Sequence, residues 1–271
     1  MDAQGDAATL GSGLTPLYLT YRHYPVDDPK VTGAYGEWKD YNAYSDFISS
    51  EGVPVFYARV DHVSVPLAKE GTGQVVVDFT PEPLTQDVSF VFHIEKTADV
   101  VVDSLTAEIS GIPSTMELTT GLILAQKTYK LLFRPTYAAL PSAADSASAE
   151  ALRCEASVNI PGIVRSHTED MVTGPGILQI AIYTHYDYEE EGTQRKAAKV
   201  FHAGINLYHT LKERKSLQWD EEENGYRQAS RSITVEIGSP LNIDKDGILN
   251  GGSTSTGLDQ WIPGETFEIE V

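Results

Sequence analysis

Cysteine and basic residues are scarce in this chain of 271 residues. Its single cysteine, Cys154, excludes an intramolecular disulfide and a cysteine-based zinc site. Cys154 alternates with apolar residues, so we expect it to be a small core residue. Lys and Arg total 20 against 39 Asp and Glu, which gives a net charge of -19. Such a chain repels phosphate backbones, so nucleic-acid binding is not expected.

Long apolar runs and catalytic motifs are also missing. No run approaches the length of a transmembrane helix, and the start MDAQGDAATLGSG has neither a basic region nor an apolar core. The chain has no Gly-x-Ser-x-Gly elbow, His-Glu-x-x-His helix, phosphate-binding loop or dinucleotide fingerprint. We therefore do not expect an enzyme. The chain is either cytoplasmic or the mature part of an exported protein.

An alternation of apolar and polar residues dominates positions 74–121. Apolar residues recur at every second position over 88–94 and again over 105–109. This period of two predicts consecutive antiparallel strands, because alternate side chains of a helix do not share a face. Pro81 and Pro83 lack the amide donor that a ladder needs, which predicts that a strand over 75–79 ends there.

The same pattern continues along the rest of the chain. About a dozen short strands indicate an all-β protein, and two antiparallel β-sandwiches in tandem fit the length best. We place the domain boundary at 1–124 and 125–271, with any position up to 150 open and residues 1–13 as a flexible tether. Residues 199–219 fit a strand or a short helix equally well. Further strands are expected over 17–24, 53–60, 62–67, 127–134, 153–160, 176–184, 233–237 and 266–271.

Several segments of the sequence, taken in their order along the chain, resemble those of a known protein family. VVVDFTPEPLTQDVSFVFHIEK is followed by SLTAEISGIPSTMELTTG, GILQIAIYT, ITVEIGSPLNI and GLDQWIPGETFEIEV. This order resembles the fimbrillin-like surface proteins of Bacteroidetes, from about Val53 onward. The resemblance implies two transthyretin-like β-sandwich domains, export as an outer-membrane lipoprotein, and a role as a pilus (fimbria) subunit or cell adhesion protein. Membrane contact is expected only through a lipid anchor that this chain does not contain.

The resemblance also implies strand donation between subunits. A sandwich that lacks a strand exposes an apolar groove with unpaired backbone groups, and an extended segment from a neighbour supplies both. The end of the chain has the needed alternation, although the simpler alternative is that this strand completes its own C-terminal domain. The candidate residues are Thr266, Phe267, Glu268, Ile269, Glu270 and Val271. Expected partners are other pilus or surface subunits, and a host or bacterial surface glycan or protein.

Aromatic residues suggest a different function. Trp38, Tyr41 and Tyr44 are spaced so that their rings could stack on sugars, although such clusters more often close a sandwich core. The alternative function is therefore a monomeric surface glycan-binding lipoprotein, with a second aromatic platform near Trp219.

One loop has the pattern of a cation site. Oxygen ligands at alternating positions, followed by a glycine, are how calcium loops surround the ion. The same Asp-Gly pattern also occurs in ordinary tight turns. Apart from calcium, no cofactor is expected. The candidate ligands are Asn242, Asp244, Asp246 and the carbonyl of Ile248.

Overall fold

The computed structural model describes residues 8–10, 18–21, 23–24, 47–48, 54–58, 76–140, 149–163, 176–207, 210, 214, 216–222, 225–228, 230–249 and 261–269. Every element with defined bounds is a β-strand, and within these ranges helical geometry occurs only at Thr210 and Arg214. The predicted all-β class is confirmed. No helix in the described part of the chain has the length and apolar character needed to span a bilayer.

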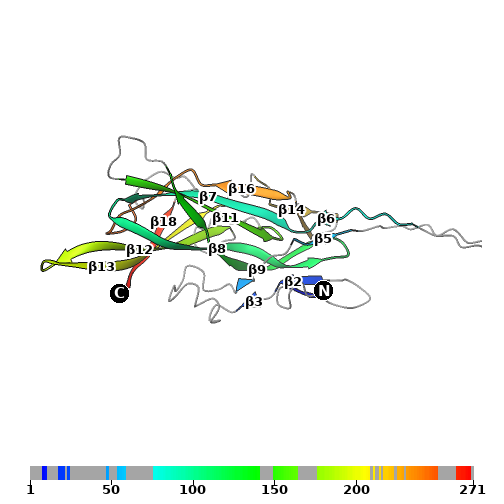
Figure 1. The fold of residues 1–271 in the computed structure, drawn as a ribbon. Helices are drawn as coiled ribbons and strands as arrows, with labels where there is room; N and C mark the ends of the chain where they lie inside the picture. Colours follow the sequence, from blue (N-terminus) through cyan, green and yellow to red (C-terminus); the bar gives the residue numbers. More distant parts are fainter. Residues whose placement is uncertain are drawn as a thin grey trace, which may run out of the picture.

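Two curled sheets form the body of the molecule (Figure 1). The main sheet has the strand order β14 (Leu217–Asp220), β15 (Gly225–Gln228), β9 (Ile123–Phe133), β8 (Val100–Glu117), β12 (Ile177–Glu190), β13 (Thr193–Asn206) and β18 (Ile262–Ile269). The second sheet has the order β10 (Thr136–Ala139), β11 (Ala149–Ile160), β7 (Gln86–Thr97) and β16 (Ser232–Glu236), and β17 (Leu241–Ile243) also pairs with β7.

Short strands from the first part of the chain add to this body. β1 (Ala8–Leu10) pairs with β2 (Tyr18–Tyr21), which pairs with β8. β3 (His23–Tyr24) pairs with β4 (Phe47–Ile48), which pairs with β9. β5 (Phe56–Tyr57) and β6 (Glu82–Pro83) form a two-stranded sheet of their own.

The core lies between the two sheets. Phe90 of β7 stacks on Phe133 of β9 with 5.3 Å between ring centres, so the two layers meet through aromatic side chains. Phe92 and Cys154 face each other in the β7–β11 ladder, and both are fully buried. Cys154 is thus a core residue as predicted, and burial raises the pKa of its thiol to about 12.

Two details differ from the predicted strands. β7 and β8 follow each other in the chain but lie in different sheets, so they are not paired with each other. Residues 76–81 contain no strand, and Pro83 lies inside β6 instead of beyond a strand end. The alternating pattern places side chains on faces but does not say which neighbour a strand pairs with.

The described strands do not divide at residue 124. That position lies inside β9. β7 pairs along its whole length with β11, and β8 pairs with both β9 and β12. Strands from both sides of residue 124 therefore share both sheets, and tandem transthyretin-like domains are not confirmed.

The main sheet is buried on both faces near the middle of β8. Glu108 alternates with the core residues of this strand, yet only 4% of it is exposed. Its carboxylate lies 3.1 Å from the ammonium of Lys130 on β9, and that ammonium lies 5.3 Å from the centre of the Phe47 ring. The alternating pattern predicts a half-buried strand here, but ion pairing and cation–π contact keep these charged groups in the interior.

Candidate interaction surfaces

The C-terminal strand lies at the edge of the main sheet. β18 pairs antiparallel with β13, and no described strand pairs with its other side. In this arrangement the predicted donation segment completes the sheet of its own chain, so its transfer to a partner stays a prediction. Thr266, Phe267, Glu268 and Ile269 face Phe201, Val200, Lys199 and Ala198 in the ladder, and Glu270 and Val271 lie outside the described residues.

The ladder between β18 and β13 is interrupted once. Its register shifts between Phe201 and Ala203, opposite the segment from Pro263 to Thr266. Proline has no amide hydrogen to donate, so sheets tolerate it at edges and irregularities. The shift separates the pairs at Ile262 and Pro263 from the four pairs that begin at Thr266.

Trp261 ties the start of β18 to the core. Only 3% of this residue is exposed, and its ring lies edge-on to Phe92 with 5.8 Å between centres. Its indole N–H donates a hydrogen bond to the carbonyl of Ser239 at 2.9 Å. The chain is therefore anchored just before the interrupted part of the ladder, and the segment beyond it coincides with the predicted donation segment.

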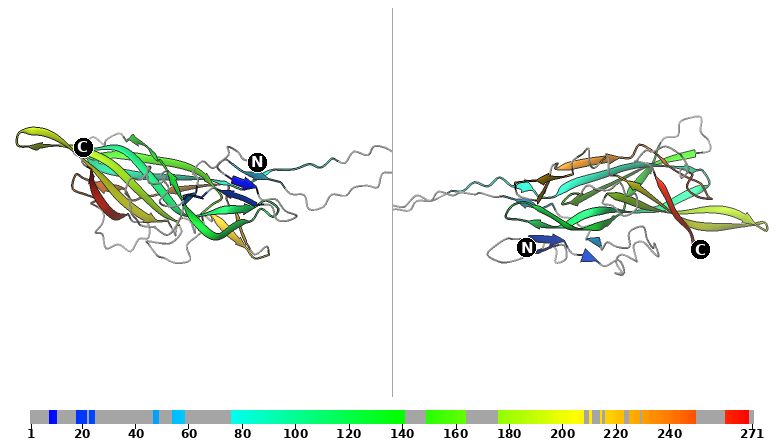
Figure 2. Two further views of the ribbon diagram at one scale, coloured as in Figure 1. Left: turned by 90° about the horizontal axis from the view of Figure 1, so that it is seen from below. Right: turned by 180° about the vertical axis from the view of Figure 1, so that it is seen from behind.

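A two-stranded ribbon projects from the sandwich beside β18. It is the outer part of the β12–β13 hairpin, residues 187–197, and it extends past the other strands in both views of Figure 2. Its tip is a two-residue turn at Glu191 and Gly192, where φ is 51° and 79°. Pairing of β8 with β12 ends at Tyr186, and pairing of β18 with β13 ends at Ala198. Both edges of the ribbon thus extend beyond the described neighbouring strands.

β8 contains an extra residue near the base of this ribbon. Ser104 faces Tyr183 on β12, whereas Val102 faces Thr184, so Asp103 is the extra residue of a β-bulge. A bulge increases the local twist and changes the direction of the strand.

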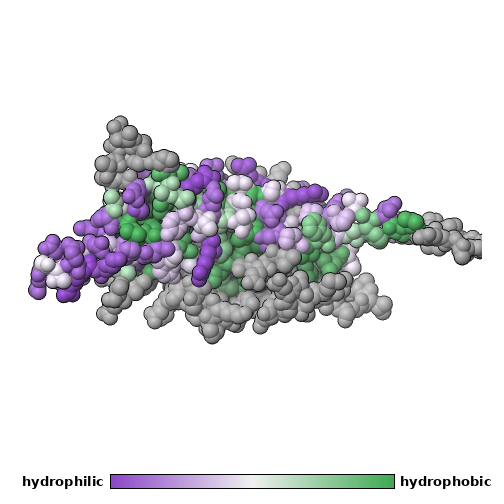
Figure 3. Space-filling model, viewed as in Figure 1, coloured by the Kyte–Doolittle hydropathy of each residue, from purple (hydrophilic) through white to green (hydrophobic). Residues whose placement is uncertain are grey.

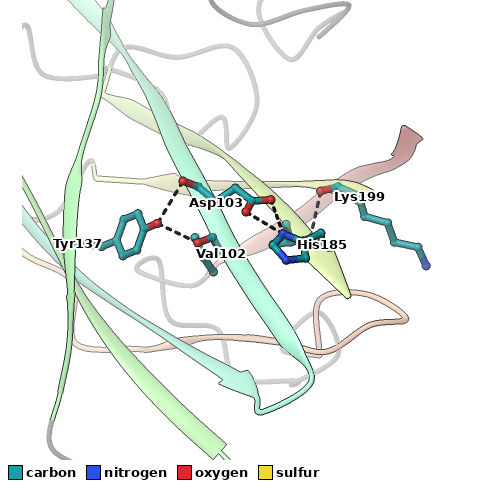
Figure 4. A network of polar contacts seen from close by, with 6 residues as sticks. Val102, Asp103, Tyr137, His185 and Lys199 are labelled. Atoms are coloured by element: carbon teal, nitrogen blue, oxygen red, sulfur yellow. Dashed lines mark hydrogen bonds and ion pairs between the residues drawn. The ribbon is translucent and has the colours of Figure 1, made fainter. Parts of the chain in front are cut away.

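Two side chains hold this bulge in place (Figure 4). The His185 Nδ1 atom lies 2.8 Å from one carboxylate oxygen of Asp103 and 2.9 Å from the other. The Tyr137 hydroxyl, on the second sheet, donates toward the carbonyls of Val102 at 2.8 Å and Asp103 at 3.2 Å. No bulge was predicted from the sequence, although the buried apolar positions change from Val100 and Val102 to Leu105 and Ala107, which is the one-residue shift in the alternation that a bulge produces.

The predicted calcium loop folds as a tight turn after β17. One carboxylate oxygen of Asp244 accepts hydrogen bonds from the amides of Asp246 and Gly247, each at 2.8 Å. Asn242 and Ile248 lie on the two arms that the turn joins. Among the described residues, no three His, Cys, Asp or Glu side chains are grouped for a metal ion. Calcium binding stays a prediction, which calorimetric titration of the chain and of Asp244→Ala tests.

The aromatic candidates are only partly described. Trp38, Tyr41 and Tyr44 lie outside the described residues. Trp219 of β14 is 43% exposed and meets Tyr226 of β15 edge-on, with 5.0 Å between ring centres.

The two ends of the molecule differ in surface character (Figure 3). The projecting ribbon is hydrophilic, whereas apolar residues lie exposed near β5 and β6 at the opposite end. The latter include Phe56, Val76 and Phe79, each more than half exposed.

Comparisons with known proteins give one structural likeness. No family model matches the chain, and no curated protein matches it. A crystal structure described as a "putative adhesin" from Bacteroides ovatus ATCC 8483 is similar, with a TM-score of 0.42 and 9% sequence identity, over 89% of this chain and 71% of that chain. A likeness at this level carries no argument about function, and the fimbrillin-like resemblance stays a prediction.

Proposed function

We propose that this chain is an exported, cell-surface protein, a fimbrial subunit or adhesion protein, that joins partner subunits by β-strand pairing. The observation that carries the proposal is the position of β18, which is an edge strand paired only with β13 among the described strands. An edge strand presents backbone donors and acceptors to any extended segment that aligns with it.

The interrupted ladder supports exchange of the last part of β18. Trp261 and the pairs at Ile262 and Pro263 hold the start of the strand, while the segment from Thr266 onward forms a separate run of pairs. This segment could leave β13 without opening the core around Trp261. A donated strand forms equivalent backbone pairs in its new host, so exchange of identical segments has a low free-energy cost.

A reversible cross-link tests whether exchange is needed for assembly. Ala198 and Ile269 are opposite each other in the ladder, so the double variant Ala198→Cys/Ile269→Cys can be oxidised to lock β18 onto β13. Cys154→Ala in the same background removes the buried native thiol. We expect the oxidised protein to stay monomeric by sedimentation and the reduced protein to assemble. Equal assembly of both forms would contradict strand donation.

Deletion of residues 266–271 gives a second test in the native setting. We expect electron microscopy with antibody against the chain to show surface filaments that contain the intact protein and none that contain the truncated one. Thermal unfolding of the truncated protein is the control, because a folded monomer that fails to assemble separates loss of partners from loss of fold.

The second candidate function is glycan binding by a monomeric surface protein. The exposed ring of Trp219, held against Tyr226, favours it because flat aromatic faces stack on sugar rings. On this alternative, Trp219→Ala or Trp38→Ala weakens retention on immobilised polysaccharide and leaves assembly unchanged. The deletion of 266–271 has the opposite pattern.

A further inference from the structure

A polar cleft lies at the end of the sandwich away from the projecting ribbon, where β5, β6 and β15 meet the turn after β8. Its volume is about 300 Å³. That size is at the lower end of the range for small-molecule sites, and it suits one sugar ring or a similarly compact ligand. The lining residues are Tyr57, Glu82, Pro83, Leu84, Gly121, Arg227, Ser230 and Arg231.

Part of the cleft lining is the Tyr57 ring, which packs directly against the backbone of Gly121. Gly121 has a φ of 71°, and a Cβ atom there would lie 2.7 Å from the Tyr57 ring. Only glycine fits both the backbone conformation and the close approach. The Gly121 amide donates to the Glu117 carbonyl at 2.9 Å, which closes the turn and fixes this part of the lining.

The part of the lining that contains Ser230 and Arg231 is fixed by β7. The fully buried Gln86 side chain donates to the carbonyl of Ser230 and accepts from the Ser216 hydroxyl at 2.6 Å. The Asp87 amide donates to the Arg231 carbonyl at 3.0 Å. The backbone that carries Arg231 is therefore held in place before any ligand arrives, which lowers the entropy cost of binding.

The three charged side chains that line the cleft, Glu82, Arg227 and Arg231, form no ion pair with one another. Arg227 is held by Asp220 at 2.8 Å and by the Thr120 carbonyl at 2.9 Å. The guanidinium of Arg231 and the carboxylate of Glu82 form no ion pair or side-chain hydrogen bond with any residue that the structure describes. In a chain with a net charge of -19, a guanidinium that lines a cleft and has no carboxylate partner among the described residues is available for an outside anion.

We propose that this cleft binds a carboxylated sugar. A guanidinium matches a carboxylate through two parallel hydrogen bonds, which assigns the acid group of the ligand to Arg231. The Glu82 carboxylate can accept hydrogen bonds from neighbouring hydroxyls of the ring. The Tyr57 ring offers an apolar face for the C–H groups of the sugar. This site is distinct from β18 and does not depend on strand pairing.

Titration of the full chain with sodium glucuronate, followed by nuclear magnetic resonance shifts or calorimetry, tests the site. We expect saturable binding in the millimolar range, with glucose bound more weakly by about tenfold or more because it lacks the acid group. Arg231→Gln should weaken glucuronate binding by about tenfold. Arg195→Gln, at an exposed arginine of the projecting ribbon, is the matched control and should leave binding unchanged.

Titrations with inorganic phosphate and with alanine test whether the cleft is specific for a carboxylated sugar. Inorganic phosphate that binds as well as glucuronate would show a simple anion site, and alanine that binds better would show a zwitterion site. Either result overturns the sugar assignment, as does glucuronate binding that is absent or that Arg231→Gln leaves intact. Unfolding curves of Arg231→Gln should match those of the parent chain, since this side chain has no described partner to lose.

Discussion

The inner and outer halves of the β12–β13 hairpin form one continuous ladder but have opposite surroundings. In the inner half, Ile180 and Phe201 are fully buried, with β8 and β18 on the two sides of the hairpin. In the outer half, residues 187–196 are exposed and extend beyond both neighbouring strands. The same hairpin therefore contains a buried half and an exposed half that extends beyond the described neighbouring strands.

The difference between the halves indicates which part of the hairpin contributes to the stability of this protein. Backbone pairing alone stabilises a two-stranded ribbon little, so the outer half depends on the sandwich to which it is attached. Substitutions should therefore have large effects on unfolding in the core, intermediate effects at the base of the ribbon, and small effects at its tip.

The largest effect is expected for Phe92→Ala in the core. Phe92 is fully buried, packs on Trp261 and faces Cys154 across the ladder. We expect a loss of about 3–5 kcal/mol in the free energy of unfolding, measured by chemical denaturation. Burial raises the pKa of the Cys154 thiol to about 12 and shields it, so thiol reagents should label the variant faster than the parent. A loss below about 1 kcal/mol would show that this core is loosely packed.

A slightly smaller effect is expected for Lys130→Met. This change leaves the Glu108 carboxylate buried without its ammonium partner, 3.1 Å away in the parent chain. We expect a loss of about 3 kcal/mol in the free energy of unfolding at neutral pH. The double variant Glu108→Gln/Lys130→Met should recover much of this loss. If the double variant is as unstable as the single one, packing and not charge accounts for the effect.

An intermediate effect is expected for Tyr137→Phe at the base of the ribbon. The substitution removes only the hydroxyl that donates toward the carbonyls of Val102 and Asp103. We expect a loss of about 0.5–1.5 kcal/mol in the free energy of unfolding. Hydrogen exchange should also speed up at the amides around the bulge, while amides in the centre of β7 keep their protection. Uniform acceleration would place Tyr137 in the global core instead.

The smallest effect is expected for Arg195→Ala near the tip. Arg195 lies 2.9 Å from Glu190, but both side chains are about half exposed, at 55% and 50%. Water screens such a pair, so the free energy of unfolding should change by less than about 0.5 kcal/mol. A larger loss by chemical denaturation would mean that the ribbon contributes to the stability of the sandwich.

Local patterns in the sequence were sufficient for several features. The alternation over 88–94 predicted the inward face of β7, and the position of Cys154 among apolar residues predicted its burial. The hairpin tip is formed by Glu191 and Gly192, and glycine adopts the positive φ that such a turn needs without strain. These features follow from the conformational preferences of a few adjacent residues.

The candidate sites depended on residues far apart in the chain. Tyr57, Gly121 and Arg231 meet in one cleft, although no spacing in the sequence relates them. The bulge at Asp103 is held by Tyr137 from the other sheet and His185 from the neighbouring strand. Such meetings depend on strand order and register, which the local pattern does not encode.

The amino-acid sequence by itself determined that this protein is built of strands and which side of β7 is apolar, because a period of two is a property of the extended chain. Only the tertiary structure decided that β7 and β8 belong to different sheets, that strands on both sides of residue 124 share them, and that β18 lies at an edge. The physical reason is that backbone hydrogen bonds are alike for all residues, so the choice of partner is made by the packing of the whole core.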